Sequence, residues 1–151
     1  MISFKKILCP TDFSEFSYEA LQRAIDMASQ FKAELIVLHV VNPVPVAAGM
    51  TGYPGFNIPE YQKELAKHAR ENLDKLIKKR VPEKIRVKAE VALGNEADEI
   101  VRIAEEEDID LIVIATHGRT GIQRLFFGSV TEKVLRHTQH PVLVIPVSES
   151  E

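Results

Sequence analysis

The sequence predicts an α/β fold in which a five-stranded, mostly parallel open sheet carries helices on both faces. Five short apolar runs are expected to be strands: Lys6–Cys9, Leu35–Val41, Ile85–Leu93, Leu111–Ala115 and Val142–Val147. Four of these runs are rich in Ile, Val and Leu with little alternation, which is typical of strands buried on both faces. A helical pattern separates each run from the next, and this alternation favours parallel strands joined by right-handed crossovers.

The first two helical patterns follow the runs that begin at Lys6 and Leu35. Ser14 is the expected N-cap of the first helix. Its apolar stripe contains Ala20, Leu21, Ala24, Ile25 and Ala28. Pro59 opens the second helix, and the cationic residues 78–80 close it. The stripe of the second helix contains Tyr61, Leu65, Ala69, Leu73 or Leu76, and Ile77.

The second half of the chain continues the alternation. In the run Ile85–Leu93 apolar and polar residues alternate, which predicts a strand with one wet face near a sheet edge. Asn95 is the expected cap of the third helix, whose stripe contains Ala97, Ile100, Val101 and Ala104. The fourth helix is expected to follow Gly128-Ser129, with Val130, Val134 and Leu135 on its apolar side.

One connection, residues 42–58, is unusually long for a compact domain. It holds three Pro and three Gly and shows no periodicity. A loop of this length is often a functional lid, but a plain surface insertion fits its composition equally well.

Composition bounds the classes of function. The chain has 151 residues and is expected to form a single domain over residues 1–151, with a net charge of −3 that does not favour nucleic acid or anionic lipid. Its single cysteine, Cys9, excludes an internal disulfide and a cysteine-ligated zinc site. The apolar runs are far shorter than the roughly 20 residues that span a bilayer, and no signal peptide is visible. We therefore expect a cytoplasmic protein that binds neither nucleic acid nor membrane.

Ligands of an open parallel sheet bind at the carboxyl ends of the strands, where the strand order reverses. After the first run come Pro10, Thr11 and Asp12, followed by Ser14 at a helix start. These groups could contact a ligand, but capping of the helix explains them as well.

The segment after the fourth run is more informative. It has glycines at 118, 121 and 128 and hydroxyl groups at 116, 120, 129 and 131, and it opens the fourth helix. The free N–H groups and the positive end of a helix dipole bind phosphate readily. Cationic residues also outnumber acidic ones within 117–140. These features favour a phosphorylated small ligand, while a tight Gly-rich corner with solvated charges is the alternative.

Several other sites are excluded or disfavoured. The sequence contains no GxxxxGK[ST], no GxGxxG after its first strand and no GxSxG elbow. Cys9 has no arginine six residues later and is expected to be a small buried apolar residue. His137 and His140 have a spacing that suits metal ligands, but cations near a helix C-terminus are usual. His39 lies inside an apolar strand and is expected to be a hydrogen-bonded core residue.

Taken together, these residues resemble the universal stress proteins. The segment from Ala115 through Gly118 to Gly128-Ser129 is similar to their G-x2-G-x9-G-[S/T] nucleotide loop, and KKILCPTDFSE, LHV and HPVLVIP also resemble that family. The resemblance covers essentially the whole chain and implies the strand order 3-2-1-4-5. It also implies a site for ATP or AMP. A divalent ion, Mg²⁺ or Mn²⁺, would accompany such a nucleotide and be held mainly by phosphates and waters, because Mg²⁺ rarely has an all-protein cage.

The resemblance assigns site residues to three parts of the chain. Pro10, Thr11 and Asp12 would line the nucleoside end, and Val40 would meet the adenine through its backbone. The phosphates would be held by Gly118, Arg119, Gly128, Ser129, Val130 and Thr131. Ala115 and His117 belong to the same nucleotide loop and complete the implied site. Ala115 replaces the first glycine of the family's loop. With ordinary β dihedrals the added methyl group costs little binding free energy. It weakens binding if φ is positive at this position or if the ribose comes close to it.

Two classes of function follow. The first is an adenine-nucleotide-binding stress-response regulator with slow or no ATP hydrolysis, because the loop brings no evident general base or lysine clamp. The second is a nucleotide-independent protein-interaction module, since the family has a branch that lacks the loop. In either case the uncharged last run, Val142–Val147, is an edge strand in the order 3-2-1-4-5, so we expect a homodimer through it. The alternative is a monomer whose charged tail, Ser148–Glu151, shields this edge. A regulatory protein partner is also expected, and the sequence does not identify it.

Overall fold

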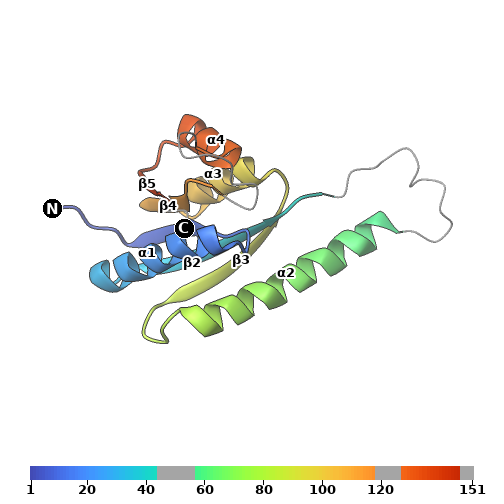
Figure 1. The fold of residues 1–151 in the computed structure, drawn as a ribbon, viewed down its shortest axis with the longest axis horizontal. Coiled ribbons are helices and arrows are strands. Elements are labelled where there is room, and N and C mark those ends of the chain that lie inside the picture. Colours follow the sequence, from blue (N-terminus) through green and yellow to red (C-terminus); the bar gives the residue numbers. More distant parts are fainter. Residues whose placement is uncertain (44–56, 118–126, 147–151) are drawn as a thin grey trace, which may run out of the picture.

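The structure is a computed structural model that describes residues 1–43, 57–117 and 127–146. Strands and helices alternate along the chain, as the sequence predicts (Figure 1). The elements are β1 (Lys6–Pro10), α1 (Glu15–Phe31), β2 (Glu34–Val41), α2 (Ile58–Arg80), β3 (Val87–Leu93), α3 (Glu96–Glu106), β4 (Leu111–Ala115), α4 (Ser129–His137) and β5 (Val142–Ile145).

All strand pairs of the sheet are parallel, and the strand order β3-β2-β1-β4-β5 confirms the expected topology. The predicted third strand begins two residues too early. Ile85 lies in the turn after α2, where its N–H donates to the carbonyl of Pro82 (3.0 Å). The last strand ends at Ile145, and Val147 lies outside the described residues.

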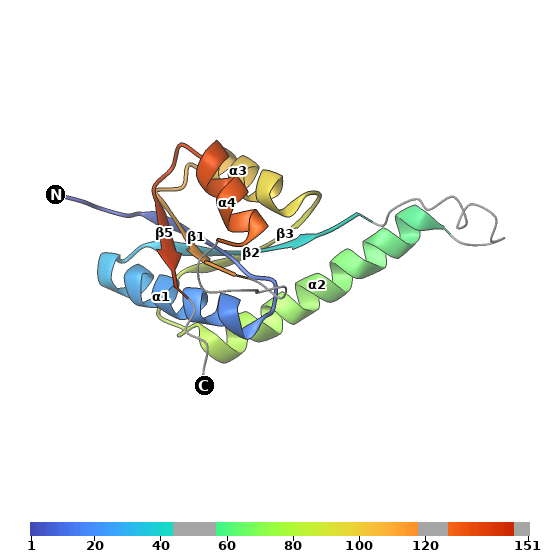
Figure 2. The ribbon, with the colours of Figure 1, turned by 45° about the horizontal axis from the view of Figure 1, so that its top comes forward.

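Helices cover both faces of the sheet, with α1 and α2 on one face and α3 and α4 on the other (Figures 1 and 2). The strand period of two divides the apolar side chains between two cores. Ile7, Leu35 and Val113 pack against α1 and α2, whereas Leu8, Ile36 and Ile112 pack against α3 and α4. The amino-terminal part of α2 extends beyond the sheet (Figure 1).

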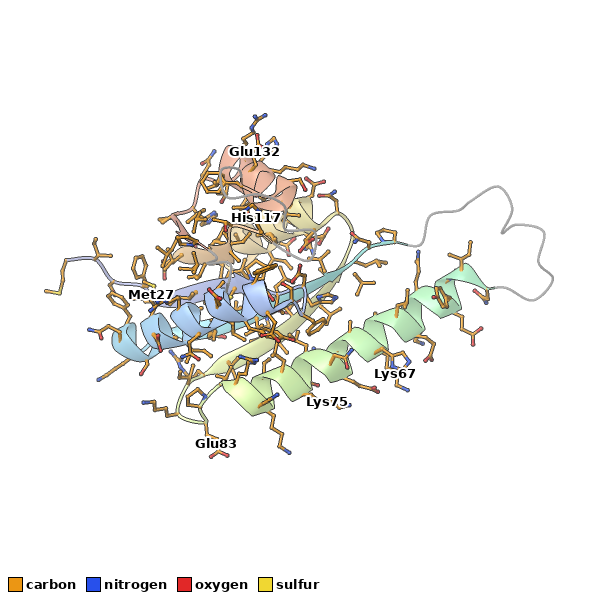
Figure 3. All side chains as sticks on the ribbon, in the orientation of Figure 1. Met27, Lys67, Lys75, Glu83, His117 and Glu132 are labelled. Carbon is orange, nitrogen blue, oxygen red and sulfur yellow. The ribbon has the colours of Figure 1, made fainter. Side chains whose placement is uncertain are left out.

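Helix ends follow local capping rules. The side chain of Ser14 accepts from the N–H of Ser17 (3.2 Å), and that of Asn95 accepts from the N–H of Asp98 (3.1 Å), which confirms both predicted caps. Asn57 caps α2 in the same way, with Pro59 in the first turn. The exposed side of α2 is polar, and Lys67 and Lys75 point away from the sheet (Figure 3). Among the described residues, no helix is both long and apolar enough to cross a membrane.

The C-cap of α1 generates a prediction about stability. Lys32 has φ 54°, a left-handed conformation that an L side chain disfavours and that glycine adopts freely. Lys32→Gly should therefore raise the free energy of unfolding by about 1 kcal/mol. Urea denaturation measures this change.

Gln30→Gly is the control, because Gln30 lies inside the last turn of α1 and is exposed. This change should lower the stability by roughly 0.5–1 kcal/mol. Loss of stability in both variants would contradict the assignment of the cap.

Candidate functional site

A pocket of about 440 Å³ lies at the carboxyl ends of β1, β2 and β4. It occupies the position where the strand order reverses, which is where open parallel sheets bind ligands. Most of the residues predicted for the site line it together: Pro10, Asp12, Val40, Ala115, His117, Gly128, Ser129, Val130 and Thr131. Gly118 and Arg119 lie outside the described residues. Thr11 is buried and is not among the lining residues.

The loop between β1 and α1 is held by its own polar side chains. Asp12 Oδ1 accepts from the N–H of Ser14 (3.0 Å), so this carboxylate stabilises the turn that leads into α1. The hydroxyl of Thr11 shares a hydrogen bond with that of Ser17 (2.9 Å) and accepts from the N–H of Phe13 (3.1 Å). The buried Thr11 therefore stabilises the shape of the loop, while Asp12 lines the pocket.

His39 joins β2 to the same loop. Its Nδ1 lies 2.8 Å from the carbonyl oxygen of Thr11, and because a carbonyl only accepts, Nδ1 carries the proton of this bond. The imidazole lies against the ring of Phe13, with centroids 4.4 Å apart, and Phe13 has φ 63°. The predicted hydrogen bond of His39 is confirmed, but the side chain is half-buried and lines the pocket.

The amino-terminal end of α4 opens into the pocket. Its N-cap is Gly128, which offers no side-chain acceptor, whereas α1, α2 and α3 are each capped by a side chain. The N–H of Gly128 donates to the carbonyl of Thr116 (2.7 Å). The N–H groups of the first turn of a helix have no intrahelical acceptor, and the helix dipole adds partial positive charge there. The first turn of α4 therefore directs N–H donors that Gly128 does not cap toward the pocket, which favours an anion at this end.

Gly128 also allows a close backbone approach. Its φ of −59° is ordinary, so the lack of a side chain is not required by the backbone conformation. A Cβ placed there would lie 3.1 Å from the carbonyl oxygen of Thr116. A larger side chain at position 128 must therefore push the Thr116 carbonyl aside or extend into the pocket that Gly128 lines.

Thr131 anchors the start of α4 to the end of β4. Its hydroxyl donates to the carbonyl of Ala115 (2.8 Å), and the residue is 3% exposed. Ala115 pairs with Ile145 in the sheet and has no positive φ. The Ala115 methyl therefore causes no backbone strain. Of the two ways in which alanine could weaken binding here, a positive φ is excluded, and close contact with the ribose is the other.

The predicted cationic segment is partly neutralised. Lys133 Nζ lies 3.1 Å from Asp98 Oδ1, and Arg136 pairs with Glu132 (2.7 Å).

Within the part of the chain that the structure describes, no group of three or more His, Cys, Asp or Glu side chains could hold a metal ion. Burial raises the pKa of the Cys9 thiol to about 12, so this residue is an unreactive part of the core.

Six lining residues were not predicted: Ser17, His39, Val41, Asn42, Glu96 and Ile114. Val41 and Asn42 end and follow β2, so the strand-end rule applied to that strand would have found them. Glu96 starts α3 and lines the pocket, and the end of β3 that precedes it is paired with the end of β2. That contact depends on the tertiary structure.

The fold and its lining residues define a doubly wound α/β protein with a pocket at its switch point. The family model for the universal stress protein family matches residues 3–146. The chain belongs to this family. It is 38% identical over 149 residues to universal stress protein MJ0531 of Methanocaldococcus jannaschii, an alignment that covers 98% of this chain and 85% of the relative.

Solved structures agree with this assignment. That of protein MJ0577, from the same organism, superposes with a TM-score of 0.82 at 32% identity and covers 99% of this chain and 100% of that one. A universal stress protein from Archaeoglobus fulgidus in complex with dAMP shares the fold, with a TM-score of 0.56 at 22% identity, covering 95% of this chain and 98% of that one.

The contact between Thr131 and Ala115 can be tested by stability. Thr131→Val keeps the shape of the side chain but leaves the buried carbonyl of Ala115 without this donor, which should cost about 1–3 kcal/mol. Thr131→Ser keeps the hydroxyl and should cost less. Denaturant titration of both variants measures the difference, and equal losses would show that the hydroxyl does not stabilise the site.

Proposed function

We propose that this protein binds an adenine nucleotide, ATP or AMP, in the pocket, with its phosphates at the start of α4. The observation that carries the proposal is the amino-terminal end of α4, which has no side-chain cap and opens into the pocket beside Gly128 and Ser129. Phosphate oxygens accept hydrogen bonds from such free N–H groups, and the helix dipole stabilises their charge. The complex of a family member with dAMP supports an adenine nucleotide as the ligand.

The rest of the pocket suits the nucleoside half. Val40 and Ile114 supply apolar surface, and Asp12 and His39 supply polar groups on the side of β1 and β2. A divalent ion, Mg²⁺ or Mn²⁺, would be held mainly by the phosphates and by water, since such ions rarely need an all-protein cage. The proposed activity is binding with slow or no hydrolysis, and the proposed role is that of a stress-response regulator. The regulatory partner and the cytoplasmic location stay predictions.

Gly128→Val tests the phosphate end of the site. The added side chain should block the approach of phosphate to the first turn of α4 and weaken ATP binding at least tenfold, or about 1.4 kcal/mol. Isothermal titration calorimetry with ATP measures this. Gln139→Val adds the same side chain at an exposed position outside the pocket and should bind as the wild type does.

The comparison has clear outcomes. Thermal unfolding of Gly128→Val establishes that the variant is folded before its affinity is read. Equal affinity of Gly128→Val and the wild type would refute the site, and absence of ATP and AMP binding to the wild type would refute the proposed function.

We also propose a homodimer through β5. In the described sheet β5 pairs with β4 alone and forms an edge, and its residues 142–145 carry no charge. Val142 and Val144 pack against the core on the α3 and α4 face, whereas Leu143 is 37% exposed. Antiparallel pairing of two such edges about a twofold axis would satisfy their backbone groups and cover Leu143.

Leu143→Lys should convert the dimer to a monomer, because it places a charge on the proposed interface without cutting into the core. Light scattering at micromolar concentration measures the mass. Tyr61→Lys, at a 44% exposed position on α2, is the control and should leave the mass unchanged. A wild-type protein with the mass of one chain at every concentration would exclude the dimer.

A further inference from the structure

Glu96 introduces a carboxylate into the pocket at a corner that the phosphate site does not use. It is the first residue of α3 and lines the pocket beside Val41 and Asn42. The N–H of Gly94 donates to the carbonyl of Val41 (3.0 Å), which fixes the start of α3 against the end of β2. Asn95 then caps the helix through the N–H of Asp98. The position of Glu96 is therefore set by the backbone on both sides.

Charge separates the two ends of the pocket. The start of α4 attracts phosphate, whereas a carboxylate repels it. A nucleotide with its phosphates on α4 therefore directs its uncharged half toward Glu96. The other lining carboxylate, Asp12, accepts from the N–H of Ser14 in the turn before α1. Asp12 follows β1, which β2 separates from β3 and the start of α3.

The surroundings of Glu96 suit a base rather than a sugar. Val40 and Val41 end β2, which pairs with the end of β3, and they are 7% and 8% exposed. Both line the pocket, where they offer apolar surface to a flat ring. A carboxylate only accepts hydrogen bonds, so it favours a ring that carries an N–H donor on its edge. A half-buried acceptor beside an apolar surface matches the exocyclic amino group of a purine or pyrimidine base.

We infer that Glu96 is a specificity-determining residue that accepts a hydrogen bond from the exocyclic amino group of the bound base. The inference rests on the proposed nucleotide function and extends it to the choice of base. Adenine presents such an amino group at C6, and hypoxanthine presents a carbonyl oxygen there. Two acceptors that face each other with no proton between them repel, so the site discriminates ATP from ITP.

The experiment compares Kd values for ATP, ITP and 2′-deoxy-ATP by calorimetry in the wild type and in Glu96→Gln. The wild type should prefer ATP to ITP by about tenfold, as expected for one hydrogen bond in a partly open pocket. In Glu96→Gln this preference should fall at least threefold, because an amide can donate to the carbonyl of hypoxanthine. The ratio of ATP to 2′-deoxy-ATP should stay constant.

Asp98→Asn is the matched control. It removes the same charge from the same turn of α3, but Asp98 pairs with Lys133 and does not line the pocket, so the preference for ATP should persist. Failure of the wild type to bind any of the three nucleotides would refute the proposed function itself. An ATP preference that is the same in the wild type and Glu96→Gln would overturn the role of Glu96 alone, as would a change confined to 2′-deoxy-ATP.

Discussion

The reversal of strand order between β1 and β4 is the constraint on which the site depends. Right-handed crossovers send the chain from β1 toward β2 over one face and from β4 toward β5 over the other. The helices that follow the two central strands, α1 and α4, therefore leave on opposite faces, and neither can fill the space between the strand ends (Figure 2). The pairing of β1 with β4 is also short, with Ile7 opposite Leu111 and Leu8 opposite Ile112. The strand ends beyond it form the floor of the pocket.

The polar groups around the pocket fall into two sets: those that stabilise the fold and those that can contact a ligand. The hydroxyls of Thr11 and Thr131 are used in hydrogen bonds inside the protein, where they tie a loop to α1 and a helix to β4. Buried polar groups must be paired because leaving them unpaired costs free energy. The donors at the start of α4 face the pocket instead, with no side-chain cap. The interior hydrogen bonds thus stabilise the residues around the pocket, whereas the donors at the start of α4 have no cap from Gly128.

The order, type and approximate limits of the elements could be predicted from the sequence because their signals are local. A buried parallel strand is a short apolar run, and a capped helix carries its cap beside it, as Ser14 and Asn95 do. The site was predictable only where it follows a strand end or a loop motif. Glu96 and Ser17 were missed because nothing local distinguishes a carboxylate or a hydroxyl that reaches a pocket from one that caps a helix. The burial of Thr11 was missed for a related reason. Its hydrogen-bond partner, Ser17, lies in the first turns of α1, and the sequence does not show that the two hydroxyls meet.

The two ends of the pocket are held at a fixed separation by the packing of α3 against α4. Val134 and Ile100 are fully buried in the core that these helices share with the sheet. Lys133 bridges the same pair, with Nζ 3.1 Å from Asp98 and 3.4 Å from Asn95 Oδ1. Partly exposed ion pairs stabilise a fold little, so the bridge acts mainly on orientation, and the buried side chains supply the stability. Because Asn95 and Glu96 start one helix and Gly128 and Ser129 start the other, this packing sets the distance between the corner of Glu96 and the anion end. In the proposed complex, a nucleotide that contacts both Glu96 and the start of α4 would have to match that distance, so its length as well as its charge would decide the fit.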